Sequence, residues 1–453
     1  MVKLLNGLIA NNSTIEQLNN EINKSMKKYL VMGLLLITTF FLFAQTKIDD
    51  IINAKEAERI EKTLSSDDMR GRRVFTPDID KAADFIADEF KKIGVQTFND
   101  SKTFKQEFAV VRPKFISASA SFDGNVIDQK DLIVITCQPN LHIDESSGYS
   151  FAHIKEGENL FSAAAVFIRA NKNVIVLVDN SFASNFSRLA NLKRFIFKTD
   201  KNFVFVLLDA APKKFTIEAK QEISEQALSN VVGVLPGKSK KDEYVIFSGH
   251  YDHLGIGKPA NGDSIYNGAN DDAAGTTAVI MLAKYFKALG NNERTIVFAA
   301  FTAEEVGGYG SQYFSRQFDP AKVVAMFNIE MIGTESKWGK NSAYITGYEK
   351  TDMGQILQKN LEGTGFTFYP DPYATQNLFY RSDNATLARL GVPAHTISTS
   401  KMDSEPNYHK VSDQVETLDM DNMTMVIKSI ALSSKTIVSG KDTPTRVKVE
   451  ELK

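Results

Sequence analysis

Apolar residues recur along the C-terminal half of the chain with two different spacings. Continuous apolar runs, which are typical of buried strands, occur in the segments NVVGVLPG, EYVIFSGH, RTIVFAAFTAEE, KVVAMFNIEMIG and GVPAHTIST. Between the second and third runs, residues 271–290 (DDAAGTTAVIMLAKYFKALG) carry apolar side chains three or four positions apart, which predicts a helix. Strands that alternate with helices predict an α/β fold with a largely parallel sheet.

The N-terminal half contains two helical patterns. Residues 46–67 (TKIDDIINAKEAERIEKTLSSD) have helical spacing throughout. The pair Thr76-Pro77 is typical of an N-cap followed by proline at the first helical position, and Gly94 is placed to end that second helix. The predicted buried face of the second helix consists of Ile79, Ala82, Ala83, Ile86 and Phe90.

The pattern changes between these two halves. Residues 112–228 contain the short apolar runs LIVITC, NVIVLVDN and NFVFVLLDA, joined by polar connections, which predicts a β-rich inserted region. The final residues are charged and predict a loose tail. The predicted organisation is an upstream extension and signal peptide (1–44), an N-terminal part of the main domain (45–111), the insertion (112–228), the main catalytic domain (229–436) and the charged tail (437–453).

Composition and charge narrow the classes of function. The chain has 453 residues, of which 43% are hydrophobic, so it can bury a sizeable core. Its 53 basic and 55 acidic residues give a net charge of −2, which indicates neither a nucleic acid nor an anionic membrane surface as partner. A single cysteine excludes an internal disulfide. No feature of the sequence indicates an oligomeric state.

The segment that begins at Met26 has the layout of a secretory signal peptide. Lys27 and Lys28 precede an apolar stretch over residues 30–43, and cleavage is expected after Ala44. The apolar stretch is roughly 14 residues long, shorter than the roughly 20 that cross a bilayer. An uncleaved N-terminal anchor is the alternative. We therefore expect an exported mature protein, periplasmic or extracellular, without a stable membrane span.

Acidic residues and a histidine follow the ends of the predicted strands. These candidate residues are His250, Asp252, Asp271, Asp272, Glu304, Glu305 and Glu330. Ligands of open α/β sheets bind outside the carboxyl ends of the strands, so these side chains should converge. Converging carboxylates repel one another unless a cation compensates, and histidine with carboxylate ligands suits zinc. Taken singly, Asp271 could instead cap a helix, and Glu304 and Glu305 could be a solvated pair.

Five sequence motifs occur in the same order as in a known family of enzymes. FSGHYDHLG, NGANDDAAGTTAV, TAEEVGGYGS, NIEMIG and NYHKVSD, which lie between about residues 229 and 436, resemble the zinc aminopeptidases of metallopeptidase family twenty-eight. That family also includes relatives of glutamate carboxypeptidase and glutaminyl cyclases. The resemblance implies a phosphorylase/hydrolase-like, three-layer α/β sandwich around a mostly parallel, mixed central sheet. Relatives also insert a protease-associated domain at the position of residues 112–228.

The resemblance implies specific roles for the residues of these motifs. His250, Asp271 and Glu330 would bind one zinc ion, and Asp271, Glu305 and His409 would bind a second. Many relatives have aspartate where this chain has Glu330. Glu304 would be the general base that activates a metal-bridging water. In addition, Tyr408 would donate a hydrogen bond to the oxyanion, Asp252 would orient His250, the Asp271–Asp272 peptide would be cis, His253 would have no ligand role, and Arg381, Asp383 and Asn384 would lie at the pocket rim.

The implied function is that of a secreted two-zinc exopeptidase acting on peptides, with an aminopeptidase as the leading hypothesis. A carboxypeptidase-type enzyme, which would hold a terminal carboxylate with arginine, stays open. A glutaminyl cyclase-like enzyme with one zinc ion and a non-catalytic, receptor-like relative are further alternatives. The complete ligand set, together with Glu304, argues against both of these last two.

Overall fold

The computed structural model describes residues 48–260 and 262–452. The chain divides into two compact units, residues 1–51 and residues 52–453. In the first unit the described part is helix α2 (Ile48–Ile51). The predicted signal peptide and its cleavage after Ala44 lie outside the described residues. Within the described part of the chain, no helix combines the length and apolar character that a membrane span requires.

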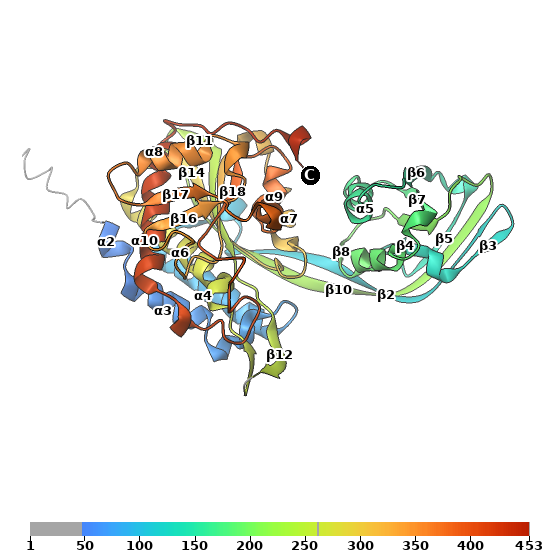
Figure 1. Ribbon diagram of the computed structural model, residues 1–453, viewed down its shortest axis with the longest axis horizontal. Coiled ribbons are helices and arrows are strands. Elements are labelled where there is room, and N and C mark those ends of the chain that lie inside the picture. The colour runs from blue at the N-terminus through green and yellow to red at the C-terminus, as the bar shows by residue number, and fades with distance from the viewer. Residues whose placement is uncertain (1–47, 261, 453) are drawn as a thin grey trace, which may run out of the picture. The chain divides into compact units, whose positions relative to one another are not determined.

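A mixed sheet is the framework of the second unit (Figure 1). Its central strands are, in spatial order, β18 (Ala394–Ser398), β15 (Val323–Ile329), β11 (Lys240–His250) and β14 (Arg294–Phe301). These four run parallel to one another. β16 (Ser342–Ile345) and β17 (Thr367–Pro370) extend one side, and β10 (Phe215–Leu235), β2 (Lys105–Phe122) and β3 (Asn125–Ile127) extend the other. The predicted α/β fold with a mostly parallel, mixed sheet is confirmed.

Helices cover both faces of this sheet (Figure 1). Successive residues of a strand point to opposite faces, so each central strand packs side chains against both layers of helices. Phe247 of β11 stacks on Phe286 of α6 (Ala274–Leu289), with ring centroids 5.4 Å apart. Ile246 points the other way, into an apolar cluster with Phe314 of α7 (Tyr309–Ser315) and Leu387 of α9 (Asn384–Ala388). Further helices of the second unit are α3 (Ala54–Leu64), α4 (Pro77–Ile93), α8 (Met353–Asn360), α10 (Met420–Ser433) and α11 (Lys435–Val438). The arrangement is the predicted three-layer sandwich.

The two helical patterns of the N-terminal half have different outcomes. α4 begins at Pro77 after Thr76 and ends at Gly94, which takes the left-handed conformation with φ of 79°. All five residues of its predicted face are buried. Residues 46–67, which have helical spacing, contain two helices, α2 and α3, and α3 begins where the side chain of Asn53 accepts a hydrogen bond from the Glu56 amide.

The predicted insertion contains a second sheet. Its strands are, in spatial order, β4 (Leu132–Ile135), β9 (Phe203–Leu207), β7 (Val174–Val178) and β6 (Ser150–Ile154). One face packs on α5 (Leu160–Arg169), and the other packs on β2, β10 and β5 (Asn140–Asp144). β2 and β10 pair without interruption from Lys105 and Val231 to Phe122 and Phe215, apart from one register shift. Both strands therefore cross the boundaries that the sequence predicts for the insertion.

The end of the chain is packed against the main sheet, so the prediction of a loose tail is wrong. The buried guanidinium of Arg294 donates to the carbonyl oxygens of Ile437 and Asp442, each at 2.7 Å. Arg446 donates to the carbonyl oxygen of Val323 at 2.7 Å, and Val447 is buried. Although this segment is charged, hydrogen bonds from Arg294 of β14 and from Arg446 of the tail to backbone carbonyl oxygens hold it in place.

Candidate metal centre and active site

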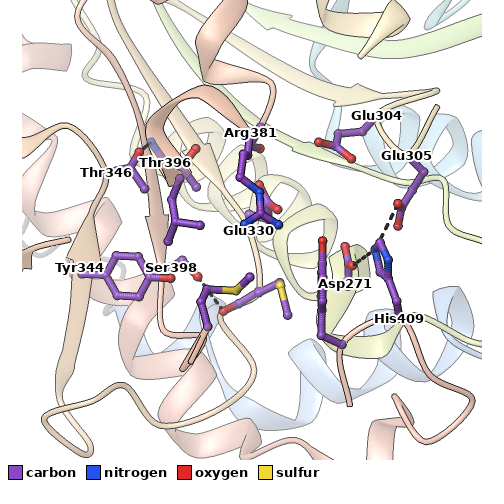
Figure 2. A pocket seen from close by; sticks show the side chains of 15 residues that line it. Asp271, Glu304, Glu305, Glu330, Tyr344, Thr346, Arg381, Thr396, Ser398 and His409 are labelled. Atoms are coloured by element: carbon purple, nitrogen blue, oxygen red, sulfur yellow. Dashed lines mark hydrogen bonds and ion pairs between the residues drawn. The ribbon is translucent and has the colours of Figure 1, made fainter. Parts of the chain in front are cut away.

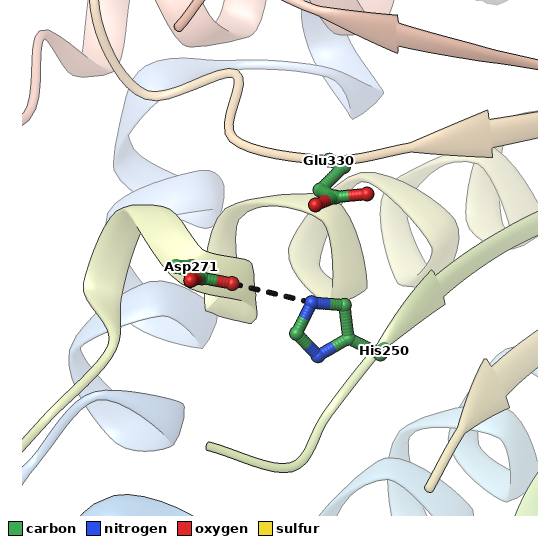
Figure 3. A group of neighbouring side chains, drawn as sticks. All are labelled: His250, Asp271 and Glu330. Carbon is green, nitrogen blue, oxygen red and sulfur yellow. Dashed lines mark ion pairs between the residues drawn. The ribbon is translucent and has the colours of Figure 1, made fainter. Parts of the chain in front are cut away.

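The candidate residues converge where the parallel strands end. His250 is the last residue of β11, Glu330 directly follows β15, and Asp271 lies in a turn of π-helix (Ala269–Ala273) immediately before α6. His250 Nε2 is 3.2 Å from Asp271 Oδ1, and one ligand atom from each of the three residues lies within 4.8 Å of the others (Figure 3). The geometry matches the ligand group that the resemblance implied for one metal ion.

A second group shares Asp271 with the first. His409 Nε2 lies 3.2 Å from Asp271 Oδ2 and 3.2 Å from Glu305 Oε2 (Figure 2). His253 approaches the same carboxylates from the other side, with its Nδ1 at 2.8 Å from Glu305 Oε1. One ligand atom from each of His253, Asp271 and Glu305 lies within 4.8 Å of the others. The structure therefore brings two histidines to this group, whereas the sequence suggested a ligand role only for His409.

Two buried atoms at this site have neither a hydrogen bond nor an ion pair with the described part of the chain. They are His253 Nε2 and Glu330 Oε2. A buried polar atom without a partner costs roughly 1–3 kcal/mol, more when it is charged. These atoms belong to an imidazole and a carboxylate, the donor types that bind zinc. The unpartnered atoms and the close spacing of the two groups fit two metal ions that share Asp271.

The pKa values reflect how tightly the charges are packed. Burial alone would lower the pKa of His250, but the carboxylates of Asp252 and Asp271 outweigh it and raise that pKa well above the ordinary value. Burial raises the pKa of Glu330 to about 7, since the opposing effect of His250 is smaller. For His409 the effect of burial is again outweighed, and Asp271 and Glu305 raise its pKa to about 10. In the absence of metal cations, these raised pKa values favour the protonated forms of His250, Glu330 and His409.

Glu304 lies beside both groups and belongs to neither. Glu304 is half-buried, and desolvation of its carboxylate raises its pKa well above the ordinary value. The amides of Glu304 and Glu305 donate to the two carboxylate oxygens of Asp252, at 3.0 and 3.3 Å. His250 Nδ1 instead contacts the backbone oxygen of Asp252 at 3.1 Å, with the carboxylate 3.7 Å away. Asp252 therefore holds the loop of Glu304, and it contacts His250 mainly through its backbone.

Two further buried carboxylates position the ligand-bearing segments. Asp272 accepts hydrogen bonds from the amides of His250 at 3.1 Å, Gly275 at 2.9 Å and Met331 at 3.1 Å. Its peptide bond with Asp271 is cis, as the resemblance implied. Asp413 accepts from the amides of Asn270 and Asp271 at 2.8 and 3.0 Å. Sequence reasoning gave no role to Asp413, although it ends the NYHKVSD motif that suggested His409.

A buried arginine from outside these motifs joins the same loops. The guanidinium of Arg72 donates to the carbonyl oxygens of Tyr251 at 2.7 Å, Asn267 at 2.6 Å and Gly268 at 2.9 Å. Arg72 is fully buried, and burial lowers its pKa despite the nearby carboxylates. It therefore fixes the segments that precede Asp252 and Asp271. The segment RGRRVF showed only a loose resemblance, and nothing in its spacing distinguished Arg72 from its neighbours.

A cavity of about 220 Å³ opens beside the candidate metal groups (Figure 2). Its other lining residues include Met331, Tyr344, Thr346, Leu378, Thr396, Ser398 and Met402. Arg381 lines the cavity near Glu330, as predicted for the rim (Figure 2). Asn384 is instead fully buried and is not among the lining residues; its amide donates to the carbonyl oxygen of Phe379 at 3.0 Å. Tyr408 lines the cavity with its ring stacked on His409, at a centroid distance of 3.9 Å.

The model of peptidase family M28 matches residues 230–433, a range that contains every ligand candidate of both groups. We call residues 230–433 the M28 segment. The chain is 30% identical over 203 residues to a probable leucine aminopeptidase of Trichophyton verrucosum, and the match covers 43% of this chain and 53% of the relative. It is 28% identical over 232 residues to leucine aminopeptidase 1 of Pyrenophora teres f. teres, with 48% and 57% covered. The chain thus spans about half the length of the curated relatives it matches.

Solved structures resemble more of the chain than the M28 segment alone. An aminopeptidase from Aneurinibacillus sp. strain AM-1 covers 90% of this chain and 98% of its own, with a TM-score of 0.52 at 18% identity. A zinc aminopeptidase from Bacillus subtilis covers 86% and 97%, with a TM-score of 0.51 at 18% identity. At this level of identity the similarity establishes the fold.

Proposed function

We propose that this chain is a two-zinc aminopeptidase that removes the N-terminal residue of peptides. The observation that carries the proposal is the pair of histidine–carboxylate groups that share Asp271 at the ends of parallel strands. His250, Asp271 and Glu330 would hold one zinc ion, and Asp271, Glu305 and His409 would hold the other. Bound zinc supplies a Lewis acid and lowers the pKa of water. The names of the curated relatives, leucine aminopeptidases, support the same activity.

Glu304 is the residue we assign as general base. It lines the cavity, it is absent from both ligand groups, and two backbone hydrogen bonds to Asp252 fix the start of its loop. Its raised pKa suits a carboxylate that accepts a proton from the attacking water and then delivers it to the leaving amine. Tyr408 lies at the same cavity, so its hydroxyl is our candidate donor to the oxyanion.

The lining residues of the cavity suggest how a substrate binds. The acidic ones, with Glu304 and Glu330, suit the ammonium group of a free N-terminus. The others include Tyr344, Leu378 and Met402, which suit an apolar side chain. Export of the mature protein, with cleavage after Ala44, completes the proposal and rests on the N-terminal sequence alone.

A carboxypeptidase-type activity is the second candidate, and the position of Arg381 favours it. Arginine binds carboxylates through paired hydrogen bonds, and Arg381 lines the cavity next to the candidate metal groups. A free C-terminal carboxylate could therefore bind where we place the N-terminal amine.

Three substrates distinguish these candidates: leucyl-anilide, N-acetyl-leucyl-anilide and an N-acylated dipeptide with a free C-terminus. We expect the zinc-loaded chain to hydrolyse the first and to leave the other two intact, since both lack a free amine. Turnover of the acylated dipeptide alone would assign a carboxypeptidase. Failure with all three substrates, at full zinc content, would refute the exopeptidase proposal.

A further inference from the structure

The loop that carries Glu304 and Glu305 has an unusual backbone and a close connection to the inserted region. Ala303 directly precedes Glu304, is fully buried and has φ of 60°, in the left-handed region that few residues other than glycine adopt. The loop closes tightly, because the amides of Gly307 and Gly308 donate to the carbonyl oxygens of Glu304 at 2.9 Å and Ala303 at 2.8 Å. Such a conformation persists only where the surroundings hold it.

Part of those surroundings comes from the predicted insertion. β8 (Ile196–Phe197) pairs with Val110 and Val111 of β2, which places Phe195 and Phe197 beside the loop. Ala303 packs in one apolar cluster with Phe195, Val110, Val74 and Leu228, and Val306 of the same loop packs on that cluster.

Tyr309 makes the direct connection between the loop and β8. Its hydroxyl donates to the backbone oxygen of Phe195 at 2.5 Å. Its ring meets Phe195 edge-on at a centroid distance of 6.3 Å and Phe197 at 5.5 Å. Burial raises the pKa of Tyr309 to about 12, so its hydroxyl keeps the proton that it donates.

From these contacts we infer that Phe195 and Tyr309 are positioning residues for the Glu304–Glu305 loop, so that the inserted region sets the geometry of the active site. The inference rests on the proposed function for its catalytic consequence. Glu304 and Glu305 are held from one side by Asp252, through their amides, and from the other by the packing of Ala303, Val306 and Tyr309 on the residues around β8. If the second support is lost, the base and one metal ligand move together.

Two substitutions weaken this contact in different ways. Phe195→Leu removes the ring that packs on Ala303 and Tyr309, whereas Tyr309→Phe keeps the ring and removes the hydrogen bond to the Phe195 carbonyl. Phe215→Leu is the matched control, because Phe215 is a similarly buried phenylalanine of the same inserted region whose cluster lies apart from the loop. All three variants are measured in the full chain for kcat and KM with leucyl-anilide, for zinc affinity by chelator competition, and for thermal unfolding.

We expect Phe195→Leu to lower kcat by about 10–100-fold, and Tyr309→Phe by about 10-fold, with a much smaller change in KM, because a misplaced base slows the reaction without preventing binding. Both variants should weaken the binding of one of two zinc ions, since Glu305 moves with the loop. Phe215→Leu should lower thermal stability about as much as Phe195→Leu and leave kcat and zinc affinity unchanged.

The inference is overturned if the loop variants keep the kcat and zinc affinity of the unsubstituted chain, or if Phe215→Leu reduces both to the same extent. The failure of the proposed function gives a different pattern. If the unsubstituted chain hydrolyses no peptide substrate, the zinc affinities still decide the matter: weaker binding in the two loop variants alone supports the positioning role, and equal binding in all chains rejects it.

Discussion

The two sheets of the second unit differ in what they bury. The four-stranded sheet of the inserted region is covered on both faces by clusters of apolar side chains, such as Phe205 and Ile175. The ends of the parallel strands in the large sheet instead bury charged groups, among them His250, Asp271 and Glu330, and one oxygen of Glu330 has neither a hydrogen bond nor an ion pair with the described residues. Burying charge costs stability, whereas burying apolar surface supplies it. The apolar clusters of the four-stranded sheet therefore stabilise the fold. The charged groups at the strand ends of the large sheet lower its stability, and we attribute them to the proposed catalytic function.

The sharpest test of this difference is Glu304→Gln, which keeps the shape of the side chain and removes its basicity. We expect kcat with leucyl-anilide to fall by about 10²–10⁴-fold, because a general base contributes that much to the rate. Zinc content should stay unchanged, since Glu304 belongs to neither ligand group. Glu362→Gln, at an exposed position, is the control. Loss of zinc together with activity would mean that Glu304 is a ligand.

The opposite result is expected in the four-stranded sheet. Ile175→Ala, at a fully buried position of β7, should lower the free energy of unfolding by about 2–5 kcal/mol, because it leaves a cavity in an apolar cluster. Ile175→Val should cost less, about 0.5–1.5 kcal/mol. Neither variant should change zinc affinity in chelator titrations. If zinc affinity fell in both variants, and fell more in Ile175→Ala than in Ile175→Val, the stability of the four-stranded sheet and the metal site would not be independent.

Glu61 is a further buried acidic group, and it makes stability depend on pH. Burial raises its pKa to about 8, against an ordinary value of 4.5. The folded chain then keeps a proton that the unfolded chain releases, so this contribution to stability is complete below about pH 4.5 and is lost as the pH rises to about 8.

Glu61→Gln resembles the protonated form at every pH and should flatten this dependence. Relative to the unsubstituted chain, we expect a gain of about 4 kcal/mol at pH 8 and of about 1 kcal/mol at pH 5, measured by denaturant unfolding. An equal difference between the two chains at both pH values would show that Glu61 is ionised in the folded state at pH 5 already.

His253 and His409 offer a smaller but more discriminating comparison. His409 completes the second ligand group in our proposal, and His253 contacts Glu305 from the other side. His253→Ala should weaken zinc binding by about 10–100-fold, the typical cost of losing a residue that orients a ligand. His409→Ala should remove one zinc ion altogether. If His253→Ala removes an ion and His409→Ala does not, their roles are exchanged.

Sequence patterns predicted those parts of the fold in which one local signal dominates. Pro77 and Gly94 mark the ends of α4 correctly, and the apolar runs locate the central strands, because cap chemistry and strand burial are written in consecutive residues. The long pairing of β2 with β10 was missed. Buried and exposed positions alternate only at the start of β10, and the register joins residues that are 93 (Phe122 with Phe215) to 126 (Lys105 with Val231) positions apart in the sequence.

The candidate site shows the same division. Side chains at strand ends and in motifs, such as His250 and Glu330, could be found from the sequence because topology brings strand ends together. Arg72 and Asp413 could not be found in this way, because they bind backbone atoms of remote loops. Every residue has the same backbone groups, so the sequence does not indicate which of them a side chain will bind. The distances between His253, Glu305 and His409 likewise exist only in three dimensions.

The measurement that tests the central claim most directly is the zinc content of the purified chain after equilibration with zinc and removal of free metal, compared with Glu330→Gln and His409→Ala. We predict two zinc ions per chain, and the loss of one ion in each variant, because each variant removes a ligand from only one of the two groups that share Asp271. Absence of zinc from the unsubstituted chain, or full zinc content in both variants, would contradict the account.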